Sequence, residues 1–257
     1  MPGVVSIRPM KTTISVLSAV LSLMFIASPD LFAASGGAVS PRGSLFSFES
    51  PKAFSIGAFY ENAPTEVEIA GYKEKAIFQH MYGVVGLDVA KWLTLRLHAG
   101  TTITGDDGDK SRLSGSAYGG GFTAKLIEYE IEKTRWMEGI WRIELHGDFT
   151  KHDSSEGGNY TDWDETFGSL TWNWEIFGAP NSLEMEPCHS LVLFAGSGYS
   201  GLDGNVKSGN YRSAWHANRD FGFVGGVELF LTKNLSFGWE LRDFEYSTYL
   251  AHVGYHF

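Results

Sequence analysis

Three histidines in this sequence have the residue type and spacing for metal or acid–base chemistry. His98, His146 and His252 fall on the polar side of alternating segments, each about five or six residues from the same end of its strand. With Glu144 or Glu240 they would supply the nitrogen and oxygen atoms of a metal or catalytic cluster. They belong to three separate strands, however, and in a small sheet only neighbouring strands bring side chains together. We therefore interpret them as members of a buried hydrogen-bond network, and we expect no metal, cofactor or catalytic residue.

A second candidate is an acidic segment, Asp106-Asp107-Gly108-Asp109. Its carboxylates are the ligands that Ca²⁺ prefers, but the segment lacks the spaced ligands and the closing Glu of the helix-loop-helix calcium site. We interpret it as a solvated acidic loop.

The elements that carry the candidate residues are β-strands. The clearest is residues 141–149, where apolar and ionisable side chains alternate; the two sets are Trp141, Ile143, Leu145, Gly147 and Phe149 against Arg142, Glu144, His146 and Asp148. In a soluble sandwich the charged face would point into water, whereas in a wall between lipid and a polar interior it would point inward. No apolar run after the first segment reaches the roughly 20 residues of a membrane helix, so a helical membrane protein is excluded.

The same alternation predicts ten strands, an even number, with eight as the alternative count. We expect them near residues 53–60, 77–89, 93–100, 117–129, 141–149, 166–177, 191–199, 221–231, 235–242 and 246–257. Long polar loops are expected at 61–75, 104–114, 151–162 and 200–219, and shorter connections at 90–92, 130–139 and 233–234. Long and short connections should alternate along the chain. Two connections depart from this alternation: 178–189 is long where a short connection is expected, and the turn at Asp243 is short where a long loop is expected.

The end of the chain carries a family resemblance. In residues 249–257 one face holds Tyr249, Ala251, Val253, Tyr255 and Phe257. This segment resembles the closing strand of bacterial outer-membrane β-barrels, in which a terminal aromatic residue belongs to the signal read by the assembly machinery. The resemblance implies an all-β, transmembrane, antiparallel up-and-down barrel, with Tyr255 and Phe257 as the assembly signal and a Gram-negative type cell envelope as its location.

The inward faces of the predicted strands collect charges of both signs. The predicted lumen network is Arg96, Lys125, Arg142, Glu144, Glu175, Glu228, Glu240 and Arg242, with Asp88 and the lumen histidines His98, His146 and His252. Because a barrel of this size is barely wider than its side chains, neighbouring strands should pair these charges. We expect a filled lumen with little or no conduction.

Aromatic residues predict the two edges of the membrane. One girdle is expected at Trp92, Tyr129, Trp136, Trp141 and Tyr255, and the other at Tyr60, Tyr118, Trp163, Tyr199 and Trp215.

The first segment has the features of a secretory signal. Basic residues precede an apolar run at 14–27, and a small residue, Ala33, ends a suitable cleavage site. We expect a cleaved signal peptide at 1–33, a periplasmic lead-in at 34–50 and the barrel at 51–257. The net charge of −10 disfavours nucleic acid as a partner, and the single cysteine, Cys188, forms no internal disulfide.

Enzymatic barrels are a further alternative. The omptin proteases, a ten-stranded family, use acidic pairs and a His–Asp pair at the outer rim. The chain has rim candidates of that chemistry, namely Asp106, Asp107, His152, Asp162, Asp164 and His216, but no His–Asp pair at the short spacing of that family. The lipid A deacylases resemble the chain only in having a late Ser and His, here Ser247 and His252, and on ten strands this His faces the lumen.

We therefore predict an integral outer-membrane barrel, not an enzyme, with a structural or surface-interaction role carried by its outer loops. A narrow, porin-like passive pore for small polar solutes and an outer-rim protease or lipid-modifying enzyme are the alternatives. The expected partners are outer-membrane lipid and lipopolysaccharide, the barrel assembly machinery and periplasmic chaperones. The sequence does not identify the extracellular partner.

Overall fold

The computed structural model describes residues 54–90, 92–106, 112–131, 138–177, 190–217, 221–232 and 234–257. The elements of this part are β-strands, and it has no helix long and apolar enough to cross a bilayer. The strands are β1 (Phe54–Ile69), β2 (Tyr72–Ala90), β3 (Leu93–Asp106), β4 (Arg112–Ile131), β5 (Glu138–Glu156), β6 (Asn159–Phe177), β7 (Ser190–Ser208), β8 (Tyr211–Ala217), β9 (Phe221–Phe230), β10 (Leu235–Asp243) and β11 (Ser247–His256).

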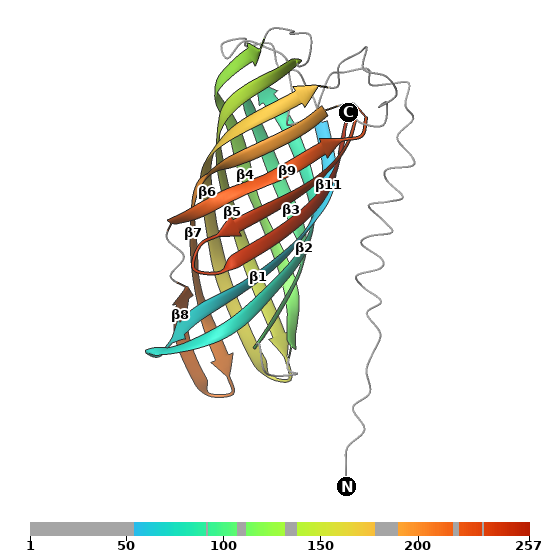
Figure 1. The fold of residues 1–257 in the computed structure, drawn as a ribbon. Coiled ribbons are helices and arrows are strands. Elements are labelled where there is room, and N and C mark those ends of the chain that lie inside the picture. The colour runs from blue at the N-terminus through green and yellow to red at the C-terminus, as the bar shows by residue number, and fades with distance from the viewer. Residues whose placement is uncertain are drawn as a thin grey trace. The chain divides into compact units, whose positions relative to one another are not determined.

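Ten of these strands close into a ring, as Figure 1 shows. Neighbours in the chain pair antiparallel from β1 to β7, then β7 pairs with β9, β9 with β10 and β10 with β11. The ring closes where β1 pairs with β11, from Ser55 opposite His256 to Asn62 opposite Tyr249. The predicted count of ten strands is confirmed, and eight strands is wrong for the ring. The ladder leaves no free edge at this level, which a strand wall in lipid requires.

The outer surface of the ring is apolar because alternate side chains face outward. Large apolar residues such as Leu97 and Trp172 are 69% and 64% exposed, while their polar neighbours point inward. Strand β7 follows the same rule although residues 191–194 are all apolar, since Val192 is buried and Leu193 is exposed. Such a surface is stable in a bilayer and not in water.

Four predicted loops are largely strand instead, and this part of the prediction is wrong. Residues 61–75 complete β1 and begin β2, 104–114 end β3 and begin β4, 151–162 end β5 and begin β6, and 200–219 end β7 and contain β8. The strands extend beyond the membrane there, so one of their faces meets water and is polar. A polar composition of this kind is also typical of loops, which explains the wrong prediction. Tight turns at the tips after β1, β5 and β7 allow these ladders to continue; one uses Ala70 and Gly71, both with positive φ, which Gly adopts readily.

The extended ends of the strands form a second closed wall that we call the outer cap. It consists of residues 63–79, 102–106, 112–116, 152–165 and 202–217. Here β8 pairs with β7 on one side and with β1 on the other, through Glu68 opposite His216 and Ile69 opposite Trp215. Strands β9, β10 and β11 do not reach this level, so β1 to β8 complete the wall without them.

The outer cap has a hydrophobic core inside its wall. The buried members are Ala63, Val67, Phe78, Trp163, Leu202, Trp215 and, at the base of β8, Ala217. Trp163 and Trp215 are 1% and 5% exposed, so their prediction as girdle residues is wrong. The reason is that their strands lie beyond the lipid, where an apolar side chain gains by pointing inward.

The outer face of the outer cap is polar. Lys73 Nζ lies 2.5 Å from a carboxylate oxygen of Glu66, across the β1–β2 ladder. The hydrogen bond from Lys73 holds the pKa of the Glu66 carboxyl below its usual range. Both groups face solvent, as expected of a wall that stands in water.

Some predictions fall outside the described residues. These are the signal peptide at 1–33, the lead-in at 34–50, the connection at 178–189 with Cys188, and the side chains of Asp107, Asp109 and Trp136.

Candidate functional site in the barrel lumen

The lumen contains four levels of side chains between the periplasmic end and the outer cap. A charged network lies nearest the periplasm, followed by a cavity of about 280 Å³, a cluster of two histidines and a glutamate, and the hydrophobic core of the outer cap. Alternation along each strand brings these side chains inward. The cavity, the cluster and the core combine side chains from strands that are not neighbours, whereas the charged network joins the neighbouring strands β4 to β7.

Arg142 is the centre of the periplasmic network. Its side chain is 0% exposed, donates from Nε to Glu128 Oε2 at 3.0 Å, and forms a second ion pair with Glu175. Lys125 Nζ lies 3.9 Å from Glu128, and Ser190 Oγ donates to Glu175 at 2.9 Å. Side chains of the four neighbouring strands β4, β5, β6 and β7 are thereby connected along the inner face of the wall. Three predicted network members, Lys125, Arg142 and Glu175, meet here.

A second group of predicted charges lines the cavity. Arg242 donates from Nε to Glu240 at 2.6 Å and lies 3.6 Å from Glu61 on β1, and its guanidinium stacks 3.8 Å from the centre of the Phe167 ring. Arg96 makes a longer contact, 4.0 Å to Asp148. The carboxylates therefore come from several strands around the cavity.

The three lumen histidines do not form a cluster with one another. His98 Nε2 lies 2.8 Å from the hydroxyl of Thr150, and His252 Nε2 lies 3.4 Å from Glu228. His146 lies between two threonine hydroxyls, at 3.0 and 3.1 Å, and 3.7 Å from Glu144. Each imidazole has its own partners.

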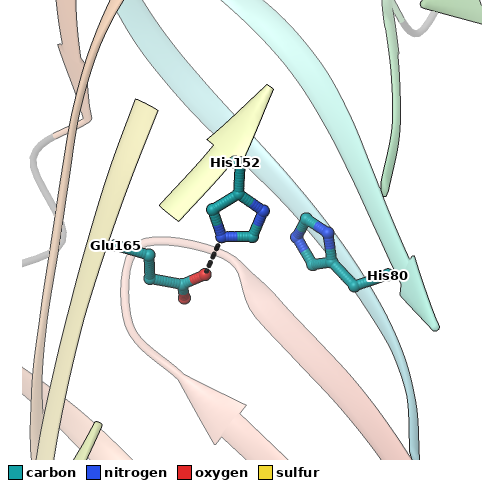
Figure 2. A group of neighbouring side chains, drawn as sticks. All are labelled: His80, His152 and Glu165. Carbon is teal, nitrogen blue, oxygen red and sulfur yellow. Dashed lines mark ion pairs between the residues drawn. The ribbon is translucent and has the colours of Figure 1, made fainter. Parts of the chain in front are cut away.

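A different cluster, which the sequence analysis did not single out, lies between the cavity and the hydrophobic core of the outer cap. It consists of His80 on β2, His152 on β5 and Glu165 on β6, all buried. One ligand atom from each residue lies within 4.8 Å of the other two. Figure 2 shows the two imidazoles and the carboxylate turned toward one another, with an ion pair of 3.4 Å from His152 Nε2 to Glu165 Oε2. We call these residues the His-His-Glu cluster.

Aromatic rings cover the outer side of the His-His-Glu cluster. His152 stacks face to face on Trp163, with centroids 4.6 Å apart and planes 4° apart, and Phe78 lies 5.2 Å from the same indole. Trp215 packs in turn on Phe78 at 5.8 Å. The cluster therefore lies in apolar surroundings on one side and borders the cavity through Glu165 on the other.

Among the described side chains, the predicted rim residues His152, Asp162, Asp164 and His216 do not assemble into an active site; the side chains of Asp106 and Asp107 lie outside the described part. His152 is 1% exposed and lies in the lumen, so its placement at the rim is wrong. His216 remains exposed and lies 4.0 Å from Glu68, and Asp164 lies 3.9 Å from Lys151. The late Ser247 donates to Asp243, whereas His252 contacts Glu228.

The sequence did contain a weak signal for the missed residues. His80 alternates with outward-facing Met81 on β2, and Glu165 shares the inward face of β6 with Phe167, while Thr166 between them is exposed. His152 and Glu165 also lie on paired strands, because Thr150 stands opposite Glu165. The contact with His80 could not be predicted from the sequence, because β3 and β4 separate β2 from β5 in the ring.

At the end of the chain, the two predicted assembly residues pack together. The rings of Tyr255 and Phe257 lie 5.0 Å apart, and Phe257 contacts Phe54 at 5.5 Å, beside the seam between β1 and β11. Their recognition by the assembly machinery stays a prediction.

No protein-family model matches this chain, and no curated protein matches it in sequence. Among solved structures it is similar to the outer membrane protein OprG from Pseudomonas aeruginosa, with 12% identity, 80% of this chain and 96% of that chain covered, and a TM-score of 0.33. An outer membrane channel from Pseudomonas putida shows 10% identity over 86% of this chain and 100% of that chain, with a TM-score of 0.37. Ail, the attachment invasion locus protein of Yersinia pestis, shows 9% identity over 80% and 98%, with a TM-score of 0.26.

The architecture itself defines the class of protein. A closed antiparallel ring of ten strands, apolar outside and polar inside, is a transmembrane β-barrel of the bacterial outer-membrane type. In such barrels the long extensions are extracellular and the short turns periplasmic, which gives the outer cap its orientation.

Proposed function

We propose that this protein is a closed, non-conducting outer-membrane barrel that presents its outer cap as a folded surface for interaction outside the cell. The observation that carries the proposal is the hydrophobic core of the outer cap, around Phe78, Trp163 and Trp215. Loops that only connect strands do not need a core of their own. A core holds the hairpins in one arrangement, and preorganisation of this kind lowers the entropic cost of binding.

The tips of three cap hairpins support an interaction role. Each tip has a glycine turn followed by an exposed tyrosine: Tyr72 is 74% exposed, Tyr160 is 40% and Tyr211 is 54%. Tyrosine is common in binding surfaces because its large ring loses little conformational entropy when it is fixed.

Closure of the lumen supports the non-conducting part of the proposal. In the described part of the chain, the buried side chains of the Arg142 network occupy the lumen side of β4 to β7 near the periplasm, and the aromatic core fills the outer cap. A narrow pore would need both levels to open. The cavity between them is therefore a chamber rather than a channel.

The proposed surface role is tested by replacing the three tip tyrosines, Tyr72, Tyr160 and Tyr211, with serine. Cells that display this variant should lose the adhesion or cell–cell aggregation that the intact protein confers, at equal amounts in the outer membrane. The matched control replaces three exposed polar neighbours, Glu74, Glu156 and Lys207, with serine and should keep it. Equal adhesion by all three proteins would overturn the surface role.

The closed lumen is tested with the intact protein in a planar bilayer. We expect no steady channel openings when insertion is verified independently. Reproducible openings of the intact protein would contradict the closed lumen and favour the pore.

A further inference from the structure

We propose that the His-His-Glu cluster, His80, His152 and Glu165, binds one divalent transition-metal ion, with Zn²⁺ as the best match. Two imidazoles and one carboxylate are a recurrent ligand set for Zn²⁺, which binds three protein ligands and a water in many sites. Ca²⁺ and Mg²⁺ prefer oxygen ligands throughout, so the two histidines select against them.

The distances fit a metal site. Ligand atoms about 2.0–2.1 Å from a tetrahedral ion lie roughly 3.4 Å from one another. The separation of His152 Nε2 and Glu165 Oε2 is already 3.4 Å, and no separation in the cluster exceeds 4.8 Å. Side-chain rotations of little more than about 1 Å would complete the geometry, without movement of the strands.

The hydrogen-bond state of His152 is an independent observation that points to a ligand. Its side chain is 0% exposed, and neither Nδ1 nor Nε2 has a hydrogen-bond partner. A buried polar atom left in this state costs about 1–3 kcal/mol, so such groups are rare in stable folds. A metal bound at Nε2 would give that nitrogen a partner, and the flat stack on Trp163 already fixes the plane of the ring.

His80 is oriented by a neighbour, as metal-binding histidines commonly are. Its Nδ1 lies 2.9 Å from the hydroxyl of Thr102 on β3, and Figure 2 shows the other side of the ring turned toward His152. A hydrogen bond at one ring nitrogen holds the tautomer that presents the other nitrogen to a metal.

The position of the site indicates its consequence for the barrel. His80 comes from β2, and the other two residues come from β5 and β6. The ion would therefore cross-link β2 to two strands with which it does not pair. Glu165 lines the cavity, from which a water molecule can supply the fourth ligand. The bound metal would stabilise the boundary between the outer cap and the cavity.

The test is titration of the intact, tag-free protein with Zn²⁺ alone after removal of metal by a chelator. We expect one ion per chain, a higher unfolding temperature with Zn²⁺ than with chelator, and no such shift with Ca²⁺. Titration with Co²⁺ should give the visible absorption of a low-coordinate nitrogen and oxygen site. An intact protein that binds no Zn²⁺ would overturn the proposal and leave the cluster as a buried ion pair.

Variants locate the bound ion. H152Q and E165Q should each weaken Zn²⁺ binding by at least about 100-fold, more than the loss typical of outer-shell changes. Two histidines outside the cluster serve as controls: H98Q changes another buried lumen histidine and H216Q an exposed one, and both should bind as the intact protein does. Unchanged binding by H152Q or E165Q, or loss of binding in H216Q alone, would overturn the assignment. If H152Q does not fold into a barrel, the Zn²⁺ affinity of E165Q and the rise in unfolding temperature of the intact protein with Zn²⁺ decide.

Discussion

The ring in the membrane and the outer cap are built from the same strands but have opposite polarity. On β6, Thr171, Asn173 and Glu175 face the lumen of the ring while Trp172 and Trp174 face lipid. Farther along the same strand Trp163 is buried inside the outer cap, and Asp162 and Asp164 flank it on the outer face. The strand keeps its alternation, but its inward face is polar in the ring and apolar in the outer cap. What decides the sense is the solvent outside, lipid at one level and water at the other.

The interiors also differ in what holds them together. The ring is connected by charges such as Arg142 with Glu128 and Glu175, whereas the outer cap is held by packed rings around Trp163. A buried ion pair costs desolvation and is sensitive to the loss of one partner, whereas an apolar core loses free energy in proportion to the volume removed. Substitutions should therefore have distinct effects at the two levels.

The largest effect is expected for Arg142→Met. Loss of the guanidinium leaves the Glu128 and Glu175 carboxylates buried without this partner, which should cost about 5 kcal/mol of the free energy of unfolding. Denaturant unfolding in lipid vesicles measures the loss. Arg96→Met is the control, since Arg96 is one-third exposed in its side chain and lies 4.0 Å from Asp148, so it should cost far less. Equal losses would contradict a central role for the Arg142 network.

Trp163→Ala should have the next largest effect, confined to the outer cap. Removal of this indole from the core should cost about 3–4 kcal/mol and leave the ring intact. Hydrogen exchange should then accelerate in the cap hairpins while the strands of the ring stay protected. Trp172→Ala removes an indole from the lipid face and should not have this pattern. Faster exchange spread evenly over all strands would show that the two levels are one cooperative unit.

Leu97→Lys tests the polarity of the outer surface directly. This side chain is 69% exposed on the ring, and a charge there should cost about 2 kcal/mol because it faces lipid. Tyr211→Lys, at a cap tip where the side chain is 54% exposed, should change stability by less than about 0.5 kcal/mol because it faces water. A comparison of the two unfolding midpoints in vesicles measures the difference. Similar costs would place both positions in the same environment.

The smallest effect is expected for the exposed pair of Glu66 and Lys73 in the outer cap. Because the folded-state pKa of Glu66 lies below its ordinary value of 4.5, the pair stabilises the fold above that pH. This contribution is lost as pH falls through the lowered pKa. The Lys73→Gln variant should therefore be slightly less stable than the intact protein at neutral pH, and the difference should vanish in acid. A difference that grows in acid would reverse the sign of the coupling.

The ring could be predicted from the sequence because lipid imposes a regular rule. In residues 141–149 each outward position is apolar or small and each inward position ionisable, so the strand and its faces follow directly. The inward placement of Arg142, Glu144 and His146 needed no knowledge of the partner strands. Their contacts required that knowledge. Glu128, which contacts Arg142, lies in a predicted strand but is not among the predicted network residues.

The outer cap could not be predicted because its pattern is short and reversed. Val67 and Ile69 alternate with Glu66 and Glu68, which is the signature of a strand, but the surrounding residues are polar enough to indicate a loop. A loop at 151–162 implies that His152 lies at the rim, whereas the strand places it inside the barrel. The His-His-Glu cluster could not be predicted from the sequence, because its members come from strands that are not all neighbours in the ring.

Strand β1 has two separate seams, and this arrangement bears on the order of assembly. Residues 55–62 pair with β11 and residues 68–69 pair with β8, so closing one seam does not require the other. Insertion of the ring into lipid can therefore be completed before the hairpins outside have found their partners. Over evolutionary time the hairpins are equally free to lengthen or shorten, since no residue that closes the ring has to change with them.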